Sequence, residues 1–170
     1  MKEFRDLFVK ELRDITNAEI QIIKLLPEMI HAAKSPKLKE AFKAHLEETK
    51  KQLHRLENIS LELNETLSGV HCDAMRGLLK EAHDAMKANY QCDVKDAALI
   101  SAAQRIEHYE IAVYGVLITF AKHLKLDKVV ALLKETIKEE GHADKKLTEI
   151  AEGSFFSEGV NTKACKRKSA

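Results

Sequence analysis

The sequence contains few of the residues that interrupt helices. Only 2 Pro and 6 Gly occur among its 170 residues, and Trp is absent. Proteins built from many short strands need Gly and Pro at their frequent turns, so this scarcity favours a few long helices. With 45% hydrophobic and 32% charged residues, the composition is that of a globular chain and excludes intrinsic disorder. The length suits one domain with a substantial core.

Long apolar runs and an excess of one charge are also missing. No run approaches the roughly 18 apolar residues of a membrane-spanning helix. The N-terminal stretch MKEFRDLF contains acidic residues and lacks the apolar segment of a secretory signal, so we expect a cytoplasmic protein. The formal net charge is +1, from 28 basic and 27 acidic residues, which gives no global attraction for nucleic acid. We therefore expect neither nucleic acid nor a membrane as a partner.

The cysteines are odd in number and widely spaced, at Cys72, Cys92 and Cys165. None of them belongs to a Cys-x-x-Cys motif or to a Cys/His cluster, which excludes a zinc site of the usual spacing. In a reducing compartment, all three are expected to remain free thiols.

Apolar residues recur at steps of three and four along most of the chain, as expected of helices with one buried face. Pro27 interrupts the first such stretch, where we expect a kink because proline cannot donate a hydrogen bond to the helix. Ser35 can cap the second helix, and Pro36 suits its first position. The pattern predicts helices over residues 2–33, 36–63, 73–88, 93–124 and 127–152.

The lengths of the connections predict how these helices are arranged. The first and last pairs of long helices have tight links, which favour antiparallel neighbours, whereas residues 65–95 can cross the length of a bundle. One long crossover is typical of ferritin-like bundles. We predict an all-α, ferritin-like antiparallel four-helix bundle over residues 1–152, whose crossover carries a short extra helix. Residues 153–170 are expected to form a flexible basic tail, with a weak anion-binding role as the alternative.

Acidic residues interrupt or border the apolar stripes of the four long helices. A buried carboxylate is costly unless it is paired, protonated or bound to metal, and Lys and Arg lie mainly on other faces. Carboxylate oxygens and imidazole nitrogens suit iron or manganese, so we expect a dinuclear centre, with iron favoured and manganese second. A metal-free hydrogen-bonded network with Tyr109, Tyr114 and histidines is the alternative. The candidate ligands are Glu19 on the first long helix, Glu48 and Gln52 on the second, Glu107 and Glu110 on the third and Glu140 on the fourth.

The spacing of these residues suggests a weak internal repeat. Positions on the first two long helices match positions on the last two at offsets of 91 or 92 residues. Two hairpins related by a pseudo-twofold axis would bring the matched acids around one centre. The repeat also makes Asp144 a candidate ligand. The matched pairs are Glu19 with Glu110, Glu48 with Glu140, and Gln52 with Asp144.

Dimetal carboxylate bundles often carry Glu-x-x-His on two of their helices. The fourth long helix contains one such motif, ending at His142, which makes this histidine a candidate ligand. The second long helix has the reverse order, His45-x-x-Glu48. The second ligand of each hairpin therefore stays open between these histidines and the pair formed by Gln52 and Asp144.

Several long stretches resemble the YciE/YciF-like stress proteins, a branch of the ferritin-like superfamily. They include HLEETKKQLHRLE (45–57), DAALISAAQRIEHYEIAVYG (96–115) and LLKETIKEE (132–140), within a resemblance that covers residues 4–150. The resemblance implies a ferritin-like bundle, often dimeric, with a dinuclear metal site and a link to bacterial stress responses, but no settled reaction. Asn17 departs from the Asp that relatives often carry, and Gly141 and His142 replace an ordinary helix-forming pair.

These observations predict a ferritin-like stress-response protein that binds a dinuclear centre and can react with oxygen or peroxide, although enzymatic turnover is left open. The alternative is a structural or protective helical dimer whose acidic site holds no metal. We expect a homodimer, because the four-helix core should leave the apolar stripe of the short helix partly exposed.

Overall fold

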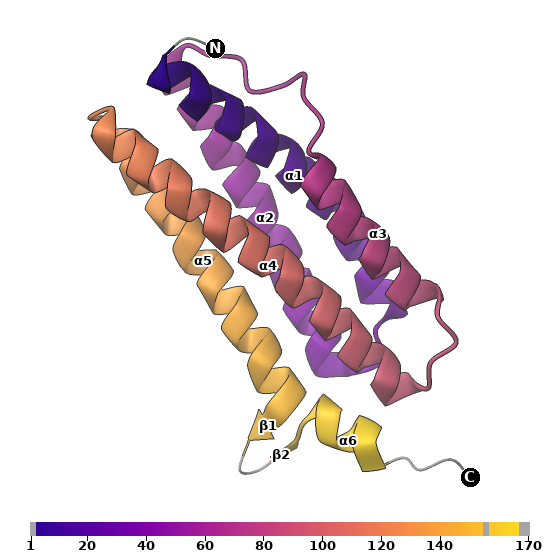
Figure 1. The fold of residues 1–170 in the computed structure, drawn as a ribbon. Coiled ribbons are helices and arrows are strands. Elements are labelled where there is room, and N and C mark those ends of the chain that lie inside the picture. Colours follow the sequence, from indigo (N-terminus) through magenta and orange to yellow (C-terminus); the bar gives the residue numbers. More distant parts are fainter. Residues whose placement is uncertain (1–2, 155–156, 167–170) are drawn as a thin grey trace.

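Four long helices lie side by side in the computed structural model, which describes residues 3–154 and 157–166 (Figure 1). α1 (Phe4–Ala32) and α2 (Pro36–Leu63) form the first antiparallel hairpin, and α4 (Cys92–His123) and α5 (Asp127–Glu152) form the second. The crossover between them carries α3 (Asp73–Lys87), which packs against α1 and α4. The predicted ferritin-like four-helix bundle with a helical crossover is confirmed. None of the described helices combines the length and the apolar composition that a membrane span requires.

The ends of the helices follow the sequence signals closely, with one exception. Pro27 lies within α1 without ending it, and Pro36 is the first residue of α2, as predicted. The side chain of Ser35, however, accepts no capping hydrogen bond. The buried Asp96 of α4 instead accepts hydrogen bonds of 2.7 Å from the backbone N–H groups of Lys34 and Ser35. A carboxylate from the second hairpin thereby fixes the turn of the first.

The bundle covers part of the apolar stripe on the short helix α3. Met75 and Leu79 have exposed fractions of 0% and 9%, and Leu78 and Met86 are partly buried against the same core. The stripe is therefore buried at Met75 and Leu79 and stays partly exposed at Leu78 and Met86, as expected. Whether this face contacts a second copy of the chain, and with it the homodimer, stays a prediction.

The chain beyond α5 forms regular structure where the composition predicted a flexible tail. β1 (Gly153–Ser154) pairs antiparallel with β2 (Ser157–Glu158), and α6 (Val160–Lys166) follows and packs on α4 and α5. The side chain of Val160 is 4% exposed and belongs to the core, so α6 is anchored rather than frayed. Of the basic residues, Lys163 and Lys166 lie on α6, whereas Arg167 and Lys168 lie outside the described residues.

Two glycines allow the chain to reverse after α5. Gly153 ends the helix with a φ of +86°, a left-handed conformation that other residues rarely adopt. A side chain on Gly159 would overlap the backbone of Ala151 and Glu152. The reversal therefore depends on glycine at both positions, a requirement that the spacing of apolar residues does not reveal.

Candidate metal centre

One buried cluster of ligand-type side chains lies inside the bundle. His45 on α2, Glu107 and Glu110 on α4 and Glu140 on α5 each place one nitrogen or oxygen atom within 4.8 Å of the others. Their exposed fractions are 6%, 2%, 1% and 0%. Glu107 and Glu110 lie one turn apart on the same face of α4, so this helix alone supplies two carboxylates.

Glu19 extends the cluster to α1. It is 0% exposed and accepts a short hydrogen bond from the hydroxyl of Tyr114, which is also fully buried. Its carboxylate lies close enough to those of Glu110 and Glu140 for both groups to affect the pKa of Glu19, and the pKa of Glu110 is affected likewise. Each long helix therefore contributes an inward ligand-type side chain to the same region of the core.

The cluster and Gln52 beside it contain all the buried side-chain nitrogen and oxygen atoms that lack a hydrogen-bond partner in the described ranges. Nε2 of His45 approaches Oε1 of Glu107 to 3.2 Å, but without the geometry of a hydrogen bond. Native proteins leave very few such atoms, and a group of them in one place points to an ion or water that belongs there. The atoms are Oε2 of Glu19, both ring nitrogens of His45, Oε1 of Gln52, Oε2 of Glu107, both carboxylate oxygens of Glu110 and Oε2 of Glu140.

Burial and mutual repulsion govern the ionisation of the cluster. Loss of hydration holds the pKa values of Glu19, Glu107 and Glu110 well above their usual range, and the charge of Glu140 raises them further. Burial and the neighbouring Glu19 also raise the pKa of the Tyr114 hydroxyl. Protonated carboxyls are thus favoured in the absence of a cation, whereas a multivalent cation would favour the ionised forms.

Glu140 is held from outside by a chain of polar contacts. Nε2 of Gln52 donates a short hydrogen bond to Oε1 of Glu140 and a second, of 3.2 Å, to Oε2 of Glu139. Glu139 in turn accepts hydrogen bonds of 2.6 and 2.7 Å from the guanidinium of Arg55. Gln52, a predicted ligand, therefore presents its amide donor to the cluster. The sequence analysis did not predict a role for Arg55, although its position three residues after Gln52 places both on one face of α2.

Three predicted ligands lie outside the cluster. Glu48 is half-buried on α2, and His142 is exposed on α5. Asp144 is half-buried and accepts a hydrogen bond of 3.0 Å from Nε2 of Gln104. His45, one turn before Glu48, takes the inward position on α2 that the repeat assigned to the glutamate. Of the predicted set, the structure brings together Glu19, Glu107, Glu110 and Glu140, with Gln52 bound to the last of these.

A half-open groove leads from the surface to the cluster. It has a volume of about 1280 Å³ and runs along α2 and α5 to the C-terminal hairpin and α6. His45 and Glu107 line one end of it, with Glu48 and His142 beside them. Ions and small molecules can therefore reach the cluster without passing through the packed core.

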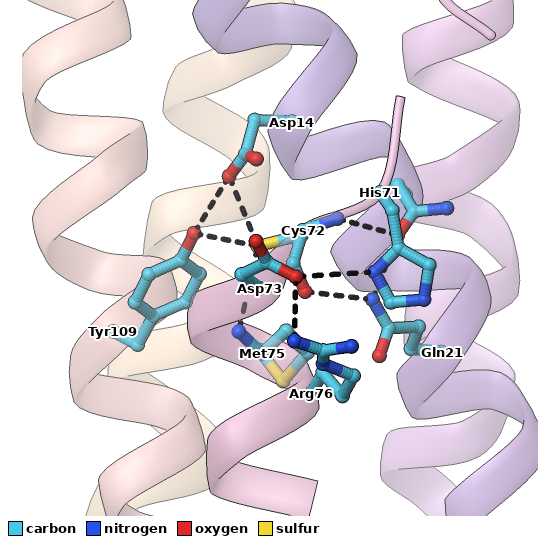
Figure 2. A network of polar contacts seen from close by, with 9 residues as sticks. Asp14, Gln21, His71, Cys72, Asp73, Met75, Arg76 and Tyr109 are labelled. Atoms are coloured by element: carbon cyan, nitrogen blue, oxygen red, sulfur yellow. Dashed lines mark hydrogen bonds and ion pairs between the residues drawn. The ribbon is translucent and has the colours of Figure 1, made fainter. Parts of the chain in front are cut away.

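A second polar network joins α1, α3 and α4 (Figure 2). Sγ of Cys72 lies 3.0 Å from Oδ2 of Asp14 and 3.1 Å from the hydroxyl of Tyr109, which donates to the same Asp14 oxygen at 2.9 Å. The backbone N–H of Cys72 donates to Oδ1 of Asn17 at 2.9 Å. Asn17 thus has a structural role, because it holds the start of α3 against α1. Burial and the hydrogen bond to Asp14 raise the pKa of the Cys72 thiol, so it stays protonated. All three cysteines are free, as expected.

The sequence of this chain matches a family that has no assigned function. The profile of the family described as a domain of unknown function, DUF892, matches residues 3–164. Protein YciF of Escherichia coli (strain K12) is 43% identical over 152 residues, which cover 89% of this chain and 92% of YciF.

Solved structures agree with this match. The crystal structure of the E. coli stress protein YciF aligns with a TM-score of 0.87 and 39% identity, over 99% of this chain and 100% of that one. YcfI from Rhodopseudomonas palustris, described as a candidate structural protein, aligns with a TM-score of 0.85 and 43% identity, over 89% of this chain and 96% of its own. The predicted resemblance is confirmed, and the chain belongs to the DUF892 family as a YciF-like protein.

Proposed function

We propose that this chain holds a dinuclear metal centre through Glu19, His45, Glu107, Glu110 and Glu140. The observation that supports this most strongly is the set of unpaired nitrogen and oxygen atoms gathered in one buried cluster. Water could satisfy these atoms but would leave several carboxylates crowded together without positive charge, which is costly in a protein interior. Metal ions would satisfy the lone pairs and balance the charge together.

The donor set favours particular metals. Four ionised carboxylates carry as much negative charge as two divalent cations carry positive charge, and His45 adds a neutral nitrogen. The cluster contains no cysteine, and carboxylate oxygens with an imidazole suit iron or manganese better than soft metals. We propose iron as the resident metal, with manganese second.

A pair of iron ions would supply electrons for chemistry with oxygen or peroxide. The chain's own residues would bind and orient the ions, because Tyr114 fixes the carboxylate of Glu19 and Gln52 fixes that of Glu140. The groove admits a small oxidant on the side of His45. Because the E. coli relative is described as a stress protein, we propose that consumption of an oxidant is this chain's contribution to stress resistance.

A structural or protective role without metal is the second candidate. It is favoured by the description of YcfI as a candidate structural protein. The raised pKa values of Glu19, Glu107 and Glu110 are compatible with it, because protons can take the place of cations in a metal-free cluster. The proposed homodimer suits either role.

Metal analysis of the isolated protein tests the proposal. Purified without chelators or a histidine tag, the chain should contain about two iron or manganese ions, as other dimetal bundles do. An anomalous scattering scan across the iron, manganese and zinc edges identifies them. The double variant Glu110→Gln/Glu140→Gln should lose the ions, whereas Glu48→Gln should retain them because Glu48 lies outside the cluster.

The outcome separates the two candidate functions. Protein that is isolated without metal and takes up neither iron nor manganese would favour the structural role. If iron binds, consumption of oxygen or peroxide by the iron-loaded protein, measured with an electrode, then distinguishes a reactive centre from a passive one.

A further inference from the structure

The groove beside the cluster is larger than an entrance for ions or small oxidants requires. Its volume is about 1280 Å³. Sites that hold drug-sized organic molecules have volumes of roughly 300–1,000 Å³, whereas oxygen, peroxide and metal ions need only a narrow passage. The groove can therefore accommodate an organic ligand that has one end at His45 and Glu107.

The walls of the groove are mainly apolar between its two ends. α2 contributes Phe42 and Ala44, and α5 contributes Leu147 and Ile150. Val160 of α6 continues this lining where the chain returns after the hairpin. A ligand that fills the groove therefore needs an apolar body, because a polar one would lose its hydration without gaining partners.

The end of the groove away from the cluster offers positive charge. Lys37 at the start of α2 and Lys163 on α6 line this end. Lys37 donates to Oγ of Ser157 at 3.3 Å, and within the described residues neither lysine is seen to pair with a carboxylate. The acids of the same rim have cations of their own, namely Glu40 with Lys43, Glu149 with Lys146 and Glu158 with Lys166.

The two ends of the groove are separated by the length of a medium alkyl chain. Lys37 and His45 both lie on α2, eight residues apart, which corresponds to about 12 Å along the helix axis. Glu48 and Glu107 at the cluster end would repel an anionic group, while Lys37 and Lys163 would attract one. The charges therefore define one orientation for an anionic ligand.

We propose that the groove binds an anionic amphiphile of the fatty-acid class, with its head group at Lys37 and Lys163 and its alkyl tail directed toward His45 and Glu107. This inference deepens the proposed function, because it names the class of organic molecule that the metal centre would meet. Binding itself depends only on the groove.

Dodecanoate is the probe, used below its critical micelle concentration with metal-free and with iron-loaded protein. Isothermal titration calorimetry should show one saturable site per chain. Dodecyltrimethylammonium, which has the same tail and the opposite charge, should bind roughly tenfold more weakly or not at all. The double variant Lys37→Gln/Lys163→Gln should weaken dodecanoate binding by roughly tenfold. The matched pair Lys122→Gln/Lys128→Gln, exposed at the far end of the bundle, should leave it unchanged.

A second variant tests the apolar part of the groove. Ala44 is exposed on α2, so Ala44→Phe places a ring in the groove without disturbing the core. This variant should lose dodecanoate binding while its circular dichroism and melting temperature stay close to those of the parent protein.

Three results would overturn the proposal. The first is the absence of saturable binding, and the second is equal binding of the two amphiphiles or unchanged binding by the Lys37/Lys163 variant. The third is a dimer, detected by sedimentation, that excludes dodecanoate and dissociates on Ala44→Phe, since the groove would then hold a second copy of the chain. Dodecanoate binding by protein that takes up no iron would refute only the proposed function, and iron uptake without dodecanoate binding would refute only this inference.

Discussion

Two of the polar networks in the bundle differ in whether their atoms have hydrogen-bond partners. Around Cys72, the thiol, the Tyr109 hydroxyl and the Asp14 carboxylate contact one another, and none of the unpaired buried atoms belongs to them (Figure 2). Around Glu110, both carboxylate oxygens of that residue are unpaired, as are atoms of every neighbouring ligand-type side chain. A satisfied network holds helices together, whereas an unsatisfied one works against packing until a ligand arrives.

The difference lies in the supply of donors. In the Cys72 network, the residue that precedes α3 brings a thiol and α4 brings a hydroxyl to one acceptor on α1. In the cluster, the four long helices bring several acceptors together, and Tyr114 and Gln52 donate to two of them. A carboxylate is therefore expected to stabilise the fold in the Cys72 network and to destabilise the metal-free fold in the cluster.

The largest effect should come from metal itself. A ligand present at 1,000 times its dissociation constant stabilises the folded state by about 4 kcal/mol. For a chain of this size each kcal/mol shifts the melting temperature by roughly 2–4 °C, so iron should raise it by roughly 10 °C. Calorimetry with iron and with a chelator measures the rise. Cys72→Ala should show the same rise, and a parent protein that melts alike in both conditions would contradict a metal centre.

The stability of the metal-free protein should depend strongly on pH, because the buried glutamates of the cluster titrate differently in the folded and unfolded chain. Unfolded glutamates ionise near pH 4.3, whereas the folded pKa values of Glu19, Glu107 and Glu110 lie well above their ordinary range. The folded chain then binds more protons than the unfolded chain, so stability is lost as the pH rises from about 4.3 toward the folded pKa values. Each group contributes up to about 1.4 kcal/mol per pH unit.

Urea unfolding of metal-free protein at about pH 5, 6.5 and 8 measures this loss. In the double variant Glu19→Gln/Glu110→Gln, the free energy of unfolding should fall less steeply with pH, because two of the responsible groups are gone. Bound iron should make the free energy of unfolding nearly independent of pH by keeping the carboxylates ionised in the folded protein. A free energy of unfolding that rises across this range would contradict the crowding of these acids.

Removing the charged acceptor of the Cys72 network should lower the free energy of unfolding moderately, whether or not metal is bound. Asp14→Asn replaces the charged acceptor of the Cys72 thiol and the Tyr109 hydroxyl, and hydrogen bonds to charged groups contribute roughly 1.5–3 kcal/mol. We expect the free energy of unfolding to fall by about 2 kcal/mol, equally with and without iron. Urea titrations under both conditions measure this, and a change in iron affinity would show that the two networks are coupled.

Much of the fold was predictable because its rules are local. The spacing of apolar residues and the positions of Pro36 and Asp127 predicted helix limits close to those observed. The expected frayed tail after α5 was wrong, because the order of this segment depends on how it packs against distant parts of the chain. Local sequence patterns do not predict that the core buries Met75. They also do not predict the close approach of Gly159 to the end of α5.

The candidate site was predictable where an acid lies inside an apolar stripe. Glu19, Glu110 and Glu140 meet that condition, and each is buried. On α2 the stripe is bordered by polar residues on both sides, so the rotation of the helix decides whether His45 or Glu48 points inward. Packing against the other helices sets that rotation, and it places His45 inward and Glu48, which the weak repeat had favoured, half-buried beside it.

The smallest effect, and the most direct comparison of the two networks, comes from Glu110→Gln. Neither oxygen of Glu110 has a partner in good hydrogen-bond geometry, while Glu140, Glu19 and Glu107 all repel its charge. The metal-free variant should be more stable than the parent by about 1 kcal/mol near pH 7.5, because the fold no longer has to hold a charge or take up a proton at this buried position. Its affinity for iron should fall, since an amide cannot replace an ionised ligand. Glu48→Gln, half-buried beside the cluster, is the matched control and should change neither quantity.

Urea unfolding and iron titration of the three proteins decide the matter. The same replacement of an acid by an amide should stabilise the metal-free fold at Glu110 and destabilise it at Asp14, and only the partners of the two carboxylates explain opposite signs. If Glu110→Gln instead lowers the stability of the metal-free protein and melts alike with and without iron, Glu110 acts as a structural hydrogen-bonding residue. The proposed centre would then lose a ligand that both its burial and its unpaired oxygens had indicated.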